Sequence, residues 1–146
     1  MKVMAAAGLL IVGLNGCSSD ERTAPSRADT LKAWRTQAQP SMDRMNDAMT
    51  WFEGAVKSSD YTAALAACRS FAGGVDSLER ELPTPDDGVT AVLRDAVTHF
   101  HDFTRECLTV SPQMGQDQAD AVVSHRDKGI ERIKTAVDMM DRIEAQ

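Results

Sequence analysis

Apolar residues recur at steps of three and four along most of the chain, which is the spacing of helices that bury one face. The first such stripe predicts a helix over residues 27–57. It comprises Leu31, Trp34, Ala38, Met42, Met45, Met49, Phe52 and Val56. Pro40 lies inside this stripe, but the pattern stays in phase on both sides of it. We therefore favour one kinked helix over a short helix followed by a main helix from Ser41.

Breaks in the pattern separate the following helices. Residues 58–60 are typical of a break that ends in a helix N-cap, and the second stripe covers residues 61–82 before Pro83 and a turn cluster. Gly73 and Gly74 lie inside this stripe. Glycine weakens a helix, so the pair indicates either the close approach of a neighbouring helix or a bend.

Two more stripes complete the pattern. The third covers residues 89–107, and the fourth covers residues 119–143. Ser111 and Pro112 precede the fourth stripe and predict a helix cap with proline at the first helical position. Four amphipathic helices joined by short connections predict an all-α fold, an antiparallel four-helix bundle over residues 27–146.

His125 and Arg126 interrupt the fourth stripe where apolar residues are expected. A polar pair at a core boundary must find partners or stay in contact with water. The pair is a candidate site for a ligand or a partner, since arginine binds carboxylates through two hydrogen bonds. The simpler interpretation is a boundary position, with the Arg126 side chain reaching out to solvent.

The N-terminal residues have the pattern of an export signal. Lys2 precedes an apolar run over residues 3–14, which is shorter than the roughly 20 residues that a membrane-spanning helix needs. The segment fits a cleaved signal peptide. It also fits an ordinary signal peptide followed by an unrelated cysteine, or a buried N-terminal helix.

The tetrapeptide LNGC at residues 14–17 resembles the lipobox of bacterial lipoproteins, with Leu three positions before the cysteine and Gly just before it. The resemblance implies cleavage before Cys17 and diacylation of its sulfur, and two acyl chains hold a protein stably on a membrane. We therefore expect a signal peptide over residues 1–16 and a lipidated Cys17 with a disordered tether over residues 17–26. The domain would then face the extracytoplasmic side of the cell membrane.

Composition restricts the partners and the core. The formal net charge is −6 at pH 7, which argues against nonspecific binding to nucleic acid or to anionic headgroups. Aromatic residues make up only 5% of the chain, so Ala, Val, Leu, Ile and Met must supply most of the core.

Cys68 and Cys107 remain once Cys17 carries lipid. Both lie on the apolar stripes of consecutive predicted helices, and exported proteins usually pair such cysteines, so we expect a disulfide. In a symmetric hairpin the two residues would differ in level by about 9 Å, which exceeds the reach of a disulfide. The bridge therefore requires a bend at residues 73–74 or staggered helices.

Two patterns contain metal-ligating residue types. Met42, Met45 and Met49 offer soft sulfur ligands that suit Cu(I), but they coincide with the core face, where methionine fills irregular space. We therefore favour the core interpretation. A haem or copper ligand pair made by one of these methionines and His125 is the alternative that the pattern leaves open.

The second pattern is a row of carboxylates around His99. Asp95 and Asp102 flank it at i−4 and i+3, a spacing that suits metal binding or proton transfer but is equally typical of a solvated helix face. His99 and His101 point about 200° apart on a helix and cannot share an ion. The solvated face is favoured, and no metal site or cofactor is predicted.

These patterns predict a protein that acts by binding in the cell envelope and not as an enzyme, since no nucleophile elbow, phosphate-binding Gly loop, HExxH or CxxC motif is present. The expected partner is an envelope protein or a cell-wall component. From residue 27 onward the pattern weakly resembles small helical lipoproteins of actinobacteria and their phages. A phage origin would suit exclusion of superinfecting phage by masking an envelope component. The alternative function is a carrier of a small ligand, haem or copper within the bundle.

Overall fold

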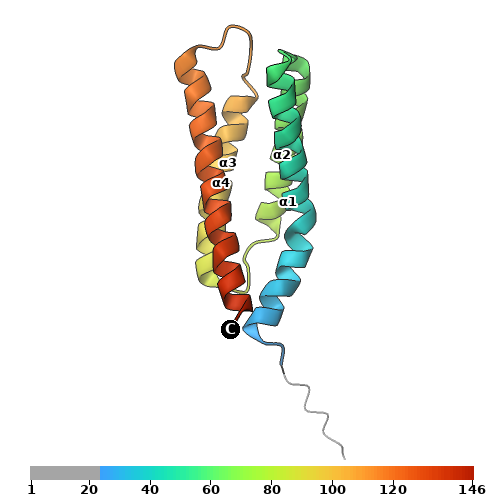
Figure 1. The fold of residues 1–146 in the computed structure, drawn as a ribbon, viewed down its shortest axis with the longest axis vertical. Helices are drawn as coiled ribbons and strands as arrows, with labels where there is room; N and C mark the ends of the chain where they lie inside the picture. Colours follow the sequence, from blue (N-terminus) through green and yellow to red (C-terminus); the bar gives the residue numbers. More distant parts are fainter. Residues whose placement is uncertain (1–23) are drawn as a thin grey trace, which may run out of the picture.

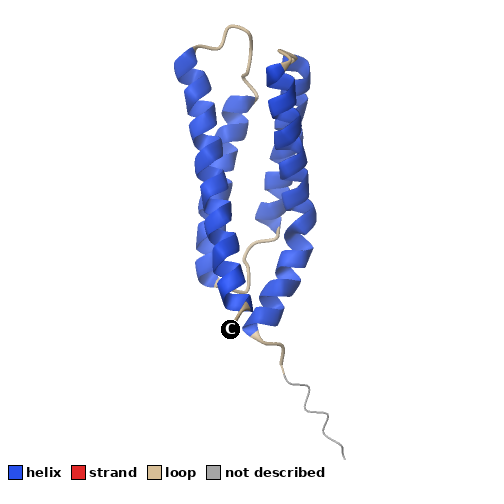
Figure 2. Ribbon diagram, in the orientation of Figure 1, coloured by secondary structure: helices blue, strands red, loops and turns tan. Residues whose placement is uncertain are grey.

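The structure, a computed structural model, describes residues 24–146. Four helices form most of this part: α1 (Arg27–Lys57), α2 (Tyr61–Arg80), α3 (Asp87–Cys107) and α4 (Gln116–Glu144). Their directions alternate, so the start of α1 and the C-terminus share one end of the bundle, the proximal end (Figure 1). The α1–α2 turn and the α3–α4 loop lie at the other, distal end. Only helices and loops occur in the described residues (Figure 2), which confirms the predicted all-α, antiparallel bundle.

The bundle is built from two closely packed hairpins. α1 packs mainly on α2, and α3 packs mainly on α4, while the seams between the hairpins are less closely packed. The α1/α4 seam is the looser of these two seams. A loose seam between helices is where grooves are expected on a bundle of this kind.

Both ends of α1 lie where the local sequence signals predict them. The backbone N–H of Asp29 donates to the Ser26 hydroxyl, and the Asp29 carboxylate accepts from Ser26 in return, which completes a capping box. The hydroxyl of Ser26, followed by its backbone N–H, lowers the pKa of Asp29.

α1 continues unbroken through Pro40, so the prediction of one helix is correct and the alternative start at Ser41 is wrong.

The predicted export segment falls almost wholly outside the described residues. The signal peptide over residues 1–16, the lipidated Cys17 and most of the tether lie there. Ser26, which was assigned to the end of the tether, is instead the N-cap of α1. The folded domain therefore begins one residue earlier than predicted.

Gly74 lies at a close approach of α2 to α1. A Cβ atom at this position would stand 2.6 Å from Cγ of Met45 and 3.3 Å from backbone atoms of α1. The close approach predicted from the glycine pair is therefore present, and Gly74 is the residue that permits it. Gly129 has the same role in α4, because a Cβ atom there would overlap the ring of Phe100.

Phe71 of α2 lies at the centre of the core. Its ring packs edge to face against Phe100 at 5.1 Å and against Phe103 at 5.2 Å between centroids. Phe52 of α1 packs in the same manner on Phe103, at 6.0 Å. Met45 is buried beside this aromatic group, which supports the core interpretation of the methionine stripe.

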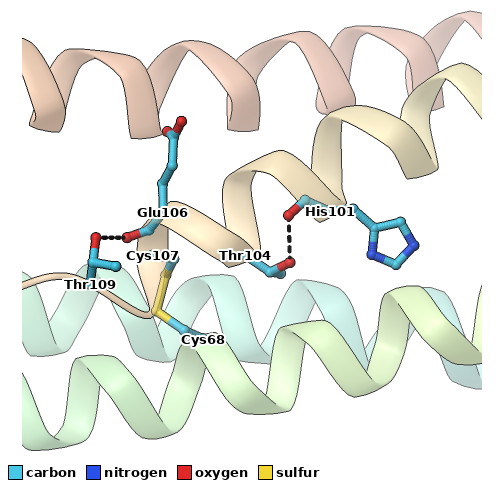
Figure 3. The surroundings of a disulfide bond; sticks show 6 residues. All are labelled: Cys68, His101, Thr104, Glu106, Cys107 and Thr109. Carbon is cyan, nitrogen blue, oxygen red and sulfur yellow. Dashed lines mark hydrogen bonds between the residues drawn. A yellow bond between two sulfur atoms is a disulfide. The ribbon is translucent and has the colours of Figure 1, made fainter.

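Cys68 and Cys107 are joined by a disulfide, with their Cα atoms 5.9 Å apart (Figure 3). Cys68 lies 12 residues before the end of α2 and Cys107 lies 20 residues after the start of α3. These positions would differ in level by about 12 Å if the hairpin were symmetric. The connection over residues 81–86 removes this difference, because it descends from the end of α2 to a lower start of α3 (Figure 1). Staggered helices, one of the two predicted solutions, thus bring the sulfur atoms together.

The predicted start of α4 is wrong. Ser111 and Pro112 do not form a cap; α4 begins at Gln116, after an extended Gly115 that makes no side-chain cap. The Met114 backbone N–H donates to Ser111 at 3.1 Å, and the Met114 side chain packs against the core. The later start of α4 lengthens the distal loop.

Candidate functional site

His125 and Arg126, the predicted pair, do not form one site. Neighbours on a helix point about 100° apart, and here each faces a different helix. His125 faces α3, where its ring nitrogens lie 3.7 Å from Asp102 and 3.7 Å from Glu106. Arg126 lies toward α1, 4.0 Å from Glu53, and also binds its neighbour Asp127. The interruption in the fourth stripe therefore belongs to two separate features, a cleft and a cluster of acids and histidines.

The first feature is a distal cleft of about 430 Å³ between α1, α4 and the α3–α4 loop. Its lining is mainly apolar and includes Phe52, Val56, Tyr61, Pro112, Met114, Val122 and Val123. Glu53, Lys57 and Arg126 supply charges at the same cleft. A concave, largely apolar surface with a few charged groups is typical of binding sites.

Val56 shows why this cleft could not be predicted. Its place at the end of the first stripe assigns it to the core, but it is 50% exposed. The late start of α4 leaves the distal turn of α1 covered only by a loop, so Val56 and Val123, which is 44% exposed, remain open to solvent. Tyr61 stands at the same edge with 36% of its surface exposed. No local signal in the sequence marks the length of the α3–α4 loop.

A second cleft of about 430 Å³ lies farther along the α1/α4 seam. Met42, Met49, Ile130 and Ile133 are among its lining residues, and Phe71 and Phe100 reach it from the core. Its methionines are residues of α1 that line the cleft together with residues of α4, whereas His125 faces the acids of α3. In the described residues, the alternative of an α1 methionine paired with His125 around haem or copper therefore gains no support from the positions of these side chains.

The proximal end of the same seam is closed by charge. Arg35 of α1 contacts Asp141 of α4 at 2.5 Å and lies 3.6 Å from Glu144. The hydrogen bond to Asp141 is the main cause that raises the pKa of Arg35. The seam is thus held at its proximal end and open at its distal end, where the first cleft lies.

The second feature, which we call the acid–histidine cluster, consists of His99, Asp102 and Glu106 of α3 with His125 of α4. One ligand atom each from His99, Asp102 and His125 lies within 4.8 Å of the others. The two imidazole centroids are 6.2 Å apart. Asp95, His99 and Asp102 were predicted to form a solvated row on α3. Asp95 is 46% exposed, but the His99 and Asp102 side chains are about three-quarters buried, as are those of Glu106 and His125.

The predicted separation of His99 from His101 is confirmed. His101 turns to α2, where it lies 3.1 Å from Glu79 in a more exposed group. Figure 3 shows Glu106 directed toward α4, while the adjacent Cys107 reaches α2 through the disulfide. The bridge therefore holds the end of α3 that presents Glu106 to α4.

Comparison with known proteins adds no relative: no family model, curated protein or solved structure matches the chain. Within residues 24–146, none of the helices combines the length and apolar character needed to cross a membrane.

Proposed function

We propose that the protein is an extracytoplasmic lipoprotein, anchored to the cell membrane through Cys17, that acts by binding an envelope protein. The buried Cys68–Cys107 bridge supports export, because structural disulfides persist in oxidising compartments. The lipobox resemblance at residues 14–17 supports the anchor. In this proposal the protein has no catalytic role and carries neither haem nor copper.

The distal cleft is the observation that carries the binding role. It lies at the end of the bundle opposite the start of α1, so a chain anchored through its N-terminal segment presents the cleft away from the membrane (Figure 1). Its aliphatic lining suits an apolar side chain of a partner. Arg126 and Glu53 suit polar groups beside that side chain.

Masking of an envelope component is the form of binding that a phage-encoded protein would use against superinfecting phage. A domain held at the membrane surface needs only one such cleft to occupy its target. This more specific role rests on the binding role and is tested after it.

A single substitution in the cleft tests the proposal. Val123→Lys places a charge among the apolar lining residues, and we expect it to reduce cross-linking of the native lipoprotein to its envelope partner in intact cells at least tenfold. Leu108→Lys is the matched control, because it converts another half-exposed aliphatic residue that does not line the cleft. Lysine near the C-terminus of α3 is also compatible with the helix dipole. Equal cross-linking by both variants would reject the cleft as the binding surface.

The alternative function, a haem or copper carrier, is examined in the same preparation. The methionines along the second cleft are the observation that favours a carrier, because thioether sulfur is a ligand for copper. A Soret absorbance band or stoichiometric copper in the purified protein would favour the carrier over the binding module.

A further inference from the structure

The acid–histidine cluster brings metal-ligating groups from two helices to one place. His99 and Asp102 lie three residues apart on α3, Glu106 follows four residues later, and His125 comes from α4. Residues at these spacings share one helix face. The atoms offered by His99, Asp102 and His125 already lie within 4.8 Å of one another, so side-chain shifts of about 1 Å place them around one ion with bonds of about 2 Å.

The imidazoles have nitrogen atoms that hydrogen bonding leaves unused. Nδ1 of His99 and Nδ1 of His125 are both buried, and neither has a hydrogen-bond partner among the described residues. Oε2 of Glu106 is also buried and also has no hydrogen-bond partner among the described residues. Buried polar atoms are nearly always paired, so the two unpaired imidazole nitrogens in one cluster point to a bound group that pairs them.

The surrounding groups suit outer-shell roles. Nε2 of His99 lies 3.8 Å from Asp95, the kind of carboxylate contact that orients a ligating imidazole. Asp95 itself is held by Arg132 at 2.7 Å. Arg105 binds Oδ1 of Asp102 at 2.7 Å, which leaves Oδ2 on the side of His125. These contacts fix the ligand groups while leaving their inner atoms available.

We propose that His99, Asp102 and His125 bind a divalent transition-metal ion of the zinc class, while Glu106 lies beside Nε2, the other ring nitrogen of His125, as an outer-shell carboxylate. Two imidazole nitrogens with a carboxylate oxygen favour Zn²⁺, and also Co²⁺ or Ni²⁺, over Ca²⁺ and Mg²⁺, which prefer all-oxygen sites. The ion would join α3 to the N-terminal half of α4, the part of α4 that also lines the distal cleft. This inference is independent of the proposed partner.

Zinc titration tests the site directly. The exported chain carrying Cys17→Ala, which removes the thiol outside the disulfide, is stripped with chelator and titrated with Zn²⁺ by calorimetry. We expect one Zn²⁺ per chain and a Tm that rises with Zn²⁺ concentration. His99→Asn and His125→Asn should each weaken binding at least about 100-fold, since even outer-shell changes cost about 10- to 100-fold. Excess Ca²⁺ should not displace the ion.

The matched control is His101→Asn, which removes a histidine of α3 that faces α2 and not the cluster. It should leave the Zn²⁺ affinity unchanged. Co²⁺ provides a readout besides affinity: its visible spectrum should show nitrogen and oxygen ligation without a sulfur charge-transfer band, and should be lost in His125→Asn. The proposal is overturned if the chain binds no Zn²⁺, if His99→Asn and His125→Asn bind as well as the parent, or if His101→Asn weakens binding equally.

Discussion

Replacing both Cys68 and Cys107 by alanine is expected to lower the free energy of unfolding by at least about 4 kcal/mol. The bridge closes a loop with a sequence separation of 39 residues. Without the bridge the unfolded chain gains conformational entropy, which stabilises the unfolded state by about 4 kcal/mol. Both cysteines are buried within the core, so two small cavities add to the loss.

Denaturant unfolding of the oxidised chain and of the double variant measures this difference. Reduction of the parent chain under native conditions provides the control, because it removes the bond while keeping both sulfur atoms. The reduced chain should lose most of the same stability but not the part due to cavities. A double variant as stable as the oxidised parent would show that the bridge does not constrain the unfolded chain.

The second large effect is expected at Phe71. Phe71→Ala removes the ring that joins α2 to both aromatic residues of α3, and large-to-small core changes of this kind cost about 3–5 kcal/mol. The lost ring also leaves a cavity beside the second cleft, whose floor it forms. The midpoint of denaturant unfolding measures this loss, provided that the m value, the dependence of the unfolding free energy on denaturant, is the same in both proteins.

Trp51→Ala is the matched control for this change. Trp51 is a larger aromatic residue on α1, but 47% of its surface is exposed. Its replacement should change stability by no more than about 0.5 kcal/mol. Equal losses at the two positions would contradict the placement of the core around Phe71.

The parts of the fold that local chemistry determines could be predicted from the sequence. The bounds of α1 follow from the first apolar stripe and from the break after Lys57, and the stripe that continues through Pro40 indicates one helix; Ser26, the N-cap, was assigned to the tether instead. The Gly73 and Gly74 pair indicated either a close helix contact or a bend, and the structure shows the close contact, at Gly74. The cysteine pairing was expected from compartment and burial, but the stagger that permits it depends on the path of residues 81–86.

The parts that depend on the relative position of helices could not be predicted. Ser111 and Pro112 have the composition of a cap, yet α4 begins only at Gln116, after a turn in which the partly buried Met114 side chain packs against the core. That delay opens the distal cleft and exposes Val56. Whether His125 meets the α3 acids depends on the register of α4 against α3, which is set by the same loop and has no signature in either helix alone.

The proposed membrane anchor depends on lipidation of Cys17. Mass spectrometry of the protein purified from its native membrane tests it directly, with Cys17→Ala as the control. We predict a chain that begins at residue 17 and carries diacylglycerol on its sulfur, and a control variant released from the membrane fraction. A native chain that still begins at Met1 with a free thiol, or a Cys17→Ala variant that remains fully membrane-bound, would contradict the anchor and the presentation of the distal cleft.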